Sequence, residues 1–476
     1  MVTNNQAEDK TPQLSDSAEN KITKKPILWV YTTYFAEGLP YAIIRILSTF
    51  YFTDIGVKER YLGYLNFLSI PWTLKFIWAP FLDLISTKRR WMIGIQFIFS
   101  LVMMAIATAC YFAYVPTIPP TFEEYIAFGY NLPPLFKHLT TFLVFISLAF
   151  VVLAFIAATN DVSIDAYYLE GFKDPKDQAA YSGDRVAAYR LAMIFSRSGV
   201  VAFVAYMAYL LQQKGNLNLS QAWGYGFGVC GITMFLIACY HFFKLPEFEN
   251  KRQEPLKVAQ TMKSFAEAFS SYLKQDKVAL ILIFIILYKI GDEILFSMNT
   301  PFMKRELKVS NAQMAWMAGI VGAAGAILGA MAGGLWIKKQ GLRKAIWPLT
   351  ILMNINIWAY TWLAYAKPDP ATVKGITLIA FVYFYEQVAS GLGSAALTVF
   401  IMRTCSPTFK AAHYAFGTAI MLIPAAVIGG FAGQMIESMG YVNFFIFAFL
   451  SSIPSMFVMF FVPIKDEQKI ATTSAS

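Results

Sequence analysis

Long apolar stretches recur along this chain, and they restrict its fold more than any other feature. Each is long enough to cross a hydrocarbon layer about 30 Å thick as a helix. With 57% hydrophobic and only 14% charged residues, the chain lacks the polar surface that a soluble protein of 476 residues needs. The sequence therefore predicts an all-α polytopic membrane protein with twelve transmembrane helices. The twelve stretches lie near residues 27–52, 61–85, 91–115, 141–170, 184–212, 222–243, 277–302, 310–337, 344–366, 371–403, 408–436 and 440–463.

The basic residues are unevenly divided between the two sides of such a bundle. A net charge of +10 is also typical of nucleic-acid-binding proteins, but here Lys and Arg are spread over short loops, which is the membrane pattern. Of the 39 Lys and Arg, 25 fall on the side of the N-terminus and 9 on the other side. This bias predicts that both termini are cytoplasmic. We expect a lipid bilayer and no nucleic acid as partners, and we expect the protein to be a monomer.

Enzyme chemistry finds no support in the sequence. The three histidines are scattered, and no zinc-protease motif, nucleophile elbow or phosphate loop is present. The four cysteines lie singly in or beside apolar stretches, which predicts free thiols and no metal site. Residues 1–25 are polar and the first apolar stretch is longer than a signal-peptide core, so we expect no cleaved signal. We expect no cofactor, with a proton gradient as the driving force.

The longest basic loop divides the chain into two sets of six predicted spans. Apolar residues recur at helical spacing within this loop, which predicts an amphipathic helix on the inner leaflet. We therefore divide the chain into a cytoplasmic tail (1–26), an N-terminal half (27–243), a linker (244–276), a C-terminal half (277–463) and a second tail (464–476). The outer loop 116–140 is unusually long, and its charged residues fit solvent exposure better than a function.

The two halves carry a weak internal similarity. The segment FYFTDIGVKERYLGY at 50–64 aligns with FMKRELKVSNAQMAW at 302–316, which places Asp54 opposite Glu306. The same offset places Glu37 opposite Lys289. Twelve spans, a central cytoplasmic loop and two related halves predict the major facilitator fold, with a site between the halves near the middle of the membrane.

Charged residues lie inside the predicted spans, where even lenient scales assign each a cost of about 2.5 kcal/mol or more. Asp161 and Asp165 are four residues apart and share a helix face, as do Arg190 and Arg197, which are seven apart. Asp165 and Arg190 lie at similar depth, so they are a candidate ion pair or gate. Of the two acids, Asp161 is the better candidate for proton coupling, and its rivals are Glu37 and the cluster of Lys289, Asp292 and Glu293. Purely structural pairing is the alternative. The full predicted substrate and proton pathway comprises Glu37, Arg45, Lys75, Asp161, Asp165, Arg190, Arg197, Lys289, Asp292, Glu293, Glu386 and Gln387.

A second cluster of charges follows the second predicted span. Asp83 stands at its end and is followed by the basic run Lys88, Arg89 and Arg90. An acid at a helix end beside a basic inner loop suits a cytoplasmic gate between helices, and it resembles the facilitator signature between spans 2 and 3. The corresponding segment of the second half has Lys338 where an acid is usual.

Several motifs, taken together, resemble one family. They are YFAEGLPYAII, PWTLKFIWAPFLD, NDVSIDAY, AYRLAMI, LYKIGDE and TPFMKREL, which occur in this order over most of the chain. The chain is thereby similar to the AmpG-type muropeptide permeases and to their relatives, the acetyl-CoA transporters. This resemblance implies proton-driven import of anhydro-muropeptides, which are peptidoglycan fragments, across the bacterial inner membrane. Lys75, Arg45 and Lys289 could then meet cargo carboxylates.

Three other functions remain open at this stage. The same fold could carry another anionic or amphipathic substrate, such as an acyl-CoA. A membrane sensor could bind such a ligand without moving it, and a channel could conduct without proton dependence.

Overall fold

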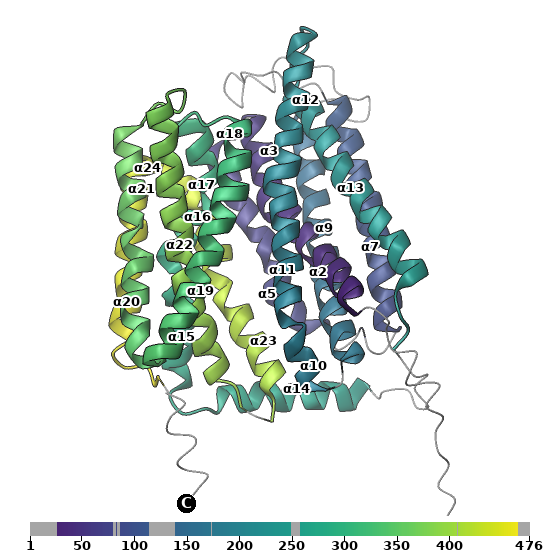
Figure 1. The fold of residues 1–476 in the computed structure, drawn as a ribbon, viewed down its shortest axis with the longest axis vertical. Coiled ribbons are helices and arrows are strands. Elements are labelled where there is room, and N and C mark those ends of the chain that lie inside the picture. The colour runs from purple at the N-terminus through teal and green to yellow at the C-terminus, as the bar shows by residue number, and fades with distance from the viewer. Residues whose placement is uncertain are drawn as a thin grey trace, which may run out of the picture.

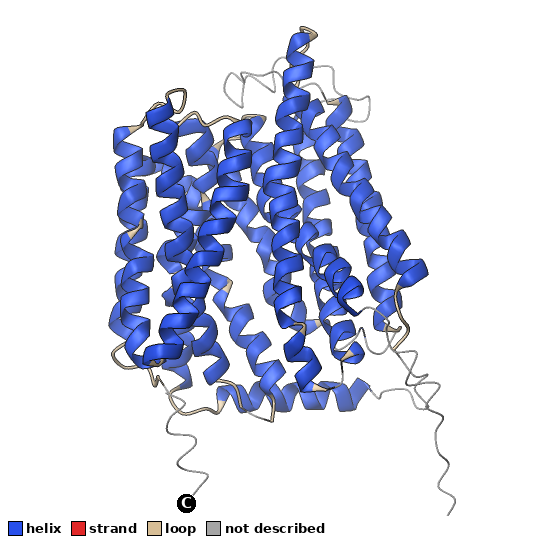
Figure 2. Cartoon of the chain, viewed as in Figure 1, coloured by secondary structure: helices blue, strands red, loops and turns tan. Residues whose placement is uncertain are grey.

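The computed structural model describes residues 26–79, 82, 86–113, 139–172, 174–248, 258–406 and 408–464. The predicted N-terminal tail, almost all of the outer loop 116–140, the gate residue Asp83 and nearly all of the C-terminal tail lie outside these residues. Within them every regular element is helical (Figure 2).

The N-terminal half contains the first six spans, several of them built from more than one helical segment. They comprise α2 (Pro26–Ala42), η1 (Ile43–Leu47) and α3 (Ser48–Asp54), then α4 (Glu59–Tyr64), η2 (Leu65–Ser69), α5 (Ile70–Leu74) and η3 (Lys75–Ile77), then α7 (Lys88–Phe112), α9 (Leu139–Gly171), the short α10 (Pro175–Ala180), α11 (Ser182–Ile194), η4 (Phe195–Val200), α12 (Val201–Gln213) and α13 (Leu219–Lys244).

The C-terminal half follows the linker helix α14 (Val258–Leu273). Its segments are α15 (Val278–Tyr288), α16 (Ile290–Ser297), α17 (Asn299–Pro301) and η5 (Phe302–Glu306), then α18 (Asn311–Trp316), η6 (Met317–Val321) and α19 (Gly322–Gln340), then α20 (Leu342–Ile355), α21 (Ile357–Ala366), α22 (Val373–Arg403), α23 (Lys410–Met421) and α24 (Ile423–Val458).

Seven helices of the described chain are long and apolar enough to cross a membrane by themselves. The last of them joins α23 to α24 and covers two predicted spans, because Gly440 turns the chain at a φ of 73° inside α24. The first, second, seventh and ninth spans are divided by π, 3-10 or irregular positions such as Lys289 and Asn356. In the second, seventh and ninth spans these breaks shorten the continuous helices, whereas the first span is continuous from residue 26 to 54 but is less apolar than the seven helices.

The two halves stand side by side, and α14 runs across one end of the bundle beneath them (Figure 1). We call this end the terminal face, because the described chain also finishes there, and the opposite end the distal face. On α14, Ala268 and Tyr272 are buried against Phe416 of α23, whereas Phe269 is 40% exposed. The helix therefore packs one side on the bundle.

Glycines let two spans of the C-terminal half approach closely. A Cβ atom at Gly329 of α19 would lie 2.1 Å from the carbonyl oxygen of Val388 in α22, and one at Gly325 would lie 2.9 Å from that of Phe384. From the other side, Gly391 of α22 meets the backbone of Ala326 and Ala330. The small residues at four-residue spacing thus serve helix packing.

Candidate functional site

A cavity of about 750 Å³ lies between the halves. On the N-terminal side it is lined by α2, η1, α11 and η4, and on the C-terminal side by α16, η6, α19, α22 and α23. Its size falls within the range of small-molecule sites. The charged and amide side chains on its wall are Glu37, Arg45, Arg185, Arg190, Arg197, Glu293 and Gln387.

Contacts between the halves seal this cavity toward the distal face. Arg305 donates to Glu59 at 2.9 Å, and Arg60 donates to Glu437 at 2.7 Å. Lys304 forms an ion pair with Asp54, which also accepts from Asn311 at 2.7 Å. At the other end the cavity wall reaches Arg185 near the start of α11 and Met402 near the end of α22. The cavity therefore extends toward the terminal face.

The structure divides the twelve predicted pathway residues into three groups. Six line the cavity, namely Glu37, Arg45, Arg190, Arg197, Glu293 and Gln387. Lys75 and Asp165 line an adjoining cavity of about 410 Å³ between the second, fourth and eleventh spans. The remaining four, Asp161, Lys289, Asp292 and Glu386, line neither cavity and lie behind the walls.

The acids of α9 are paired with bases of two other spans. Asp161 forms an ion pair with Lys75. Asp165 accepts a hydrogen bond from Arg185 at 2.7 Å and another from the Tyr34 hydroxyl at 3.0 Å. The Arg185 guanidinium also lies 4.4 Å from the centre of the Tyr34 ring. These contacts tie α9 to α2, η3 and α11.

The predicted Asp165–Arg190 pair is wrong. Arg185 and Arg190 are five residues apart, so they point about 140° away from each other around the helix. Arg185 faces α9, and Arg190 faces the cavity instead. Arg190 and Arg197 share a face as predicted, since both line the cavity. Similar depth in the membrane does not distinguish Arg185 from Arg190, because both side chains can reach the depth of Asp165.

Glu37 lines the cavity without an ion-pair partner among the described residues, whereas Glu293, the other acid on the cavity wall, is paired with Lys289. The Oε2 atom of Glu37 is buried and has no hydrogen-bond partner, and no cation lies within ion-pair distance among the described residues. Asp161, Asp165 and Lys75 are its nearest charged neighbours. Glu37 shares a side-chain hydrogen bond with Asp161, and two carboxyl groups can share one only if one of them carries a proton. A buried carboxylate without a cation is costly in a low-dielectric interior, so a proton on Glu37 would remove that cost.

The C-terminal half holds its own charge cluster. Lys289 lies 3.0 Å from Asp292 and 3.7 Å from Glu293, so the two acids on the following turn neutralise it. Ser390 donates to Asp292 at 2.8 Å. Glu386, only 1% exposed, accepts from the Gln387 amide at 2.7 Å. Of these groups only Glu293 and Gln387 reach the cavity.

Two of the cavity arginines lie in π-helical segments, which are frequent at functional sites. Arg45 belongs to η1 and Arg197 to η4. The Nε atoms of both are buried without a partner. Arg45, Arg190 and Arg197 make no ion pair with any described carboxylate, whereas Arg185, Lys75 and Lys289 each do. The cavity thus presents three guanidiniums whose charge no described carboxylate neutralises by an ion pair, although Arg45 also donates to Asn66.

The predicted cytoplasmic gate remains a prediction, because Asp83 lies outside the described residues. Lys88 begins α7 and is buried. Arg89 donates to the carbonyl oxygens of Phe242 and Leu245 at 2.8 and 3.0 Å, so it clamps the end of α13 within one half. Arg90 is exposed.

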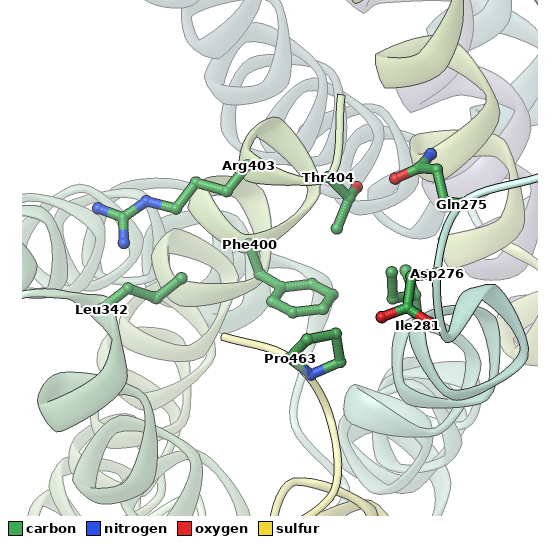
Figure 3. A pocket seen from close by; sticks show the side chains of 8 residues that line it. All are labelled: Gln275, Asp276, Ile281, Leu342, Phe400, Arg403, Thr404 and Pro463. Atoms are coloured by element: carbon green, nitrogen blue, oxygen red, sulfur yellow. The ribbon is translucent and has the colours of Figure 1, made fainter. Parts of the chain in front are cut away.

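A third cavity, of about 160 Å³, lies at the terminal face between α15, the end of α22 and the last described residues. Phe400 and Pro463 lie at its centre, and the Arg403 guanidinium points away from the Asp276 carboxylate (Figure 3). None of the predicted site residues lines it. No group of three His, Cys, Asp or Glu within the described ranges could hold a metal ion.

Sequence reasoning missed Tyr34, Arg185 and the contacts that close the distal face. The distal contacts could have been found from the internal similarity, because the aligned segments contain Asp54 and Lys304, which bind each other.

Solved structures resemble the whole chain. It is 14% identical to a bacterial homologue of the human lysosomal transporter Spinster, solved inward-facing and unoccupied, with a TM-score of 0.64 over 92% of this chain and 97% of that one. It is 13% identical to the xylose transporter XylE from E. coli in its inward-open conformation, with a TM-score of 0.60 over 93% and 96%. The predicted fold class is confirmed: this is an integral membrane protein of the major facilitator fold.

Sequence comparison gives the family. The family profile described as acetyl-coenzyme A transporter 1 matches residues 28–292, more than half of the chain. A putative transporter AmpG 4 of Rickettsia conorii is 22% identical over 92% of this chain and 96% of its own length. The anhydromuropeptide permease of Escherichia coli K12 is 23% identical over 89% of this chain and 77% of its own.

The fold and the cavity between its halves define a secondary transporter of small molecules, not an enzyme. The chain belongs to the acetyl-coenzyme A transporter and AmpG family of the major facilitator superfamily. The resemblance found in the sequence motifs is thereby confirmed.

Proposed function

We propose that this transporter imports anhydro-muropeptides into the cytoplasm by proton-coupled alternating access, as a monomer in a bacterial inner membrane. The observation that carries the proposal is that three arginines, Arg45, Arg190 and Arg197, line the cavity between the halves and form no ion pair with a described carboxylate. The printed name of the E. coli relative supports the choice of cargo.

The cavity chemistry fits a sugar-peptide with carboxylates. Guanidiniums bind carboxylates through two parallel hydrogen bonds, and such charge-assisted bonds are roughly twice as strong as neutral ones. Lys75 and Lys289 already form ion pairs with acids of the protein, so we no longer propose them as partners of cargo carboxylates. We propose Arg190 and Arg197 in their place, and we keep Arg45. The rings of Tyr41 and Tyr189 offer apolar faces to sugars.

Glu37 is the acid that we propose to carry the proton. It lines the cavity and therefore has access to water in this state. When ionised, it would compete with Asp161 for Lys75, and when neutral it would leave the Lys75–Asp161 pair undisturbed. Protonation at one carboxyl would thus change the contacts between the first, second and fourth spans, as coupling requires.

The orientation follows from the distribution of basic residues. If the terminal face is cytoplasmic, as the 25-to-9 bias predicts, the cavity extends toward the cytoplasm and the seal lies on the periplasmic side. The described conformation is then the one from which an imported cargo leaves.

A second candidate cargo is an acyl-CoA. The adjoining cavity of about 410 Å³ has mostly apolar walls, including Trp72, Phe76 and Phe416, and it shares Met421 and Leu422 with the main cavity. An anionic headgroup in the main cavity could place an apolar arm there. The description of the matching family profile, acetyl-coenzyme A transporter 1, also supports an acyl-CoA as cargo.

Uptake by purified protein in proteoliposomes separates these readings. We expect radiolabelled anhydro-muropeptide to enter under an inward proton gradient and to be displaced by unlabelled muropeptide, not by acetyl-CoA. Displacement by acetyl-CoA would favour the second candidate. Binding without entry would indicate a sensor, and entry that ignores the proton gradient would favour a channel.

A further inference from the structure

One buried side chain links the central cavity to the contacts that close the distal face. Asn66 lies in η2 and is only 6% exposed. Its amide nitrogen donates to the carbonyl oxygen of Gly429 in α24 at 3.0 Å, across the boundary between the halves, and also to that of Gly63 at 3.0 Å. Its side-chain oxygen faces the other way, toward Arg45.

Arg45 approaches Asn66 from the cavity side. Its NH1 group donates to the backbone oxygen of Asn66 at 3.1 Å and to the side-chain oxygen at 3.3 Å. Arg45 lines the main cavity and also a small void of about 30 Å³ beyond it. The same guanidinium therefore lines the main cavity and contacts Asn66, one of the residues that bridge the two halves.

These partners fix the orientation of the Asn66 amide. An arginine can only donate and a carbonyl oxygen can only accept, so the amide oxygen must face Arg45 and the amide nitrogen must face Gly429. If Arg45 turned away, the amide oxygen would lose its donor, and only the carbonyl oxygens of Gly63 and Gly429 would hold the amide. The hydrogen bond across the halves would then lose one of the contacts that align it.

The second and eleventh spans are packed too closely around Gly429 for small shifts of either helix. A Cβ atom there would lie 3.0 Å from Cγ of Asn66. At Gly433 it would lie 1.7 Å from the carbonyl oxygen of Glu59, and at Gly430 it would lie 2.4 Å from the Phe67 ring. The second and eleventh spans are in backbone contact here, so this contact is either made or broken as a unit.

We propose that Asn66 is the positioning residue through which cavity occupancy opens the distal face. An anion bound in the cavity draws the Arg45 guanidinium from the neutral oxygens of Asn66, because a carboxylate adds the attraction of a full negative charge and can accept two parallel hydrogen bonds. Asn66 then releases Gly429, and the second span separates from the eleventh. The inference rests on the proposed function only for the identity of the anion.

A labelling experiment tests this inference. Ile436 of α24, which is only 6% exposed and follows Gly433 by three residues, is replaced by Ile436→Cys on a Cys239→Ser/Cys405→Ser background. An impermeant maleimide is applied from the distal side, with and without anhydro-muropeptide. We expect slow labelling that rises at least threefold on adding cargo. With Asn66→Ala, labelling should be severalfold faster without cargo and should no longer respond to it.

Two further variants control for folding and for chemistry. Asn354→Ala removes a buried Asn whose amide bonds only within α20, and it should leave labelling unchanged. Asn66→Asp keeps an acceptor for Arg45 but lacks the donor to Gly429, so it should label as fast as Asn66→Ala.

The outcomes distinguish this inference from the choice of cargo. Faster cargo-free labelling of Asn66→Ala supports the inference even if anhydro-muropeptide proves not to be the cargo. If anhydro-muropeptide is transported but Asn66→Ala labels at the unsubstituted rate and keeps its response to cargo, the inference is overturned.

Discussion

Lys75 and Asp161, which lie 86 positions apart in the chain, form an ion pair that joins the second span to the fourth. Their side chains are 29% and 12% exposed, so the pair is partly desolvated at the edge of the cavities. Glu37 lies beside it without a cation of its own. This arrangement of two acids around one base is where we place proton coupling.

Lys75→Met should destabilise the protein because it leaves Asp161 without its cation. Breaking a fully buried pair costs about 3–5 kcal/mol, and the partial exposure reduces this to about 2 kcal/mol. Thermal unfolding in detergent measures the change. Arg60→Met breaks the more exposed Arg60–Glu437 pair and should cost under about 1 kcal/mol. Equal losses in both variants would argue against a partly buried pair.

Glu37→Gln should uncouple transport from the proton gradient. Glutamine keeps the size of the side chain but cannot exchange a proton, so exchange of internal for external cargo should persist while gradient-driven accumulation is lost. Glu267→Gln, on the exposed surface of α14, is the matched control and should accumulate cargo normally. Accumulation by Glu37→Gln at the unsubstituted level would assign coupling to another acid.

Arg45→Gln, Arg190→Gln and Arg197→Gln should each weaken binding of anhydro-muropeptide. Hydrogen bonds to a charged group contribute about 1.5–3 kcal/mol, which corresponds to roughly 10- to 100-fold in affinity. Calorimetric titration in detergent measures this loss. Lys214→Gln, at an exposed position at the end of α12, should bind with unchanged affinity. If all four variants bound alike, the cavity arginines would not be the carboxylate site.

Gly329→Ala should disrupt the packing of α19 on α22. The added methyl group would meet the Val388 carbonyl oxygen at 2.1 Å, and overpacking of this kind costs about 1–3 kcal/mol. Gly334→Ala serves as the control, because a Cβ atom at that position meets nothing within 4 Å. The difference in thermal stability between the two variants checks the prediction, and a stable Gly329→Ala protein would contradict it.

The sequence allowed the spans, the family and the set of buried charges to be predicted, because apolar length and ionisable residues in apolar stretches are local signals. The ion-pair partner of each buried charge could not be predicted in this way, because it depends on how different helices pack. Asp165 selects Arg185 over Arg190 through the rotation of α11 against α9, and Lys75 reaches Asp161 because the second span is divided into short segments. Neither geometry follows from depth along a helix.

The role of Asn66 illustrates the same limit. Its residue type is unremarkable in a sequence, and it gains importance only from Arg45 on one side and the Gly429 backbone on the other. Such contacts depend on how the two halves pack against each other. The internal similarity predicted that the halves are related, but not which residues touch between them.

Gradient-driven accumulation tests the central claim most directly. Proteoliposomes containing the protein would be given radiolabelled anhydro-muropeptide with an acidic exterior, with and without a protonophore. The account predicts that internal cargo rises above the external concentration and falls to equality when the protonophore is added. Internal cargo that never exceeds the external concentration, in protein that binds it, would contradict the account.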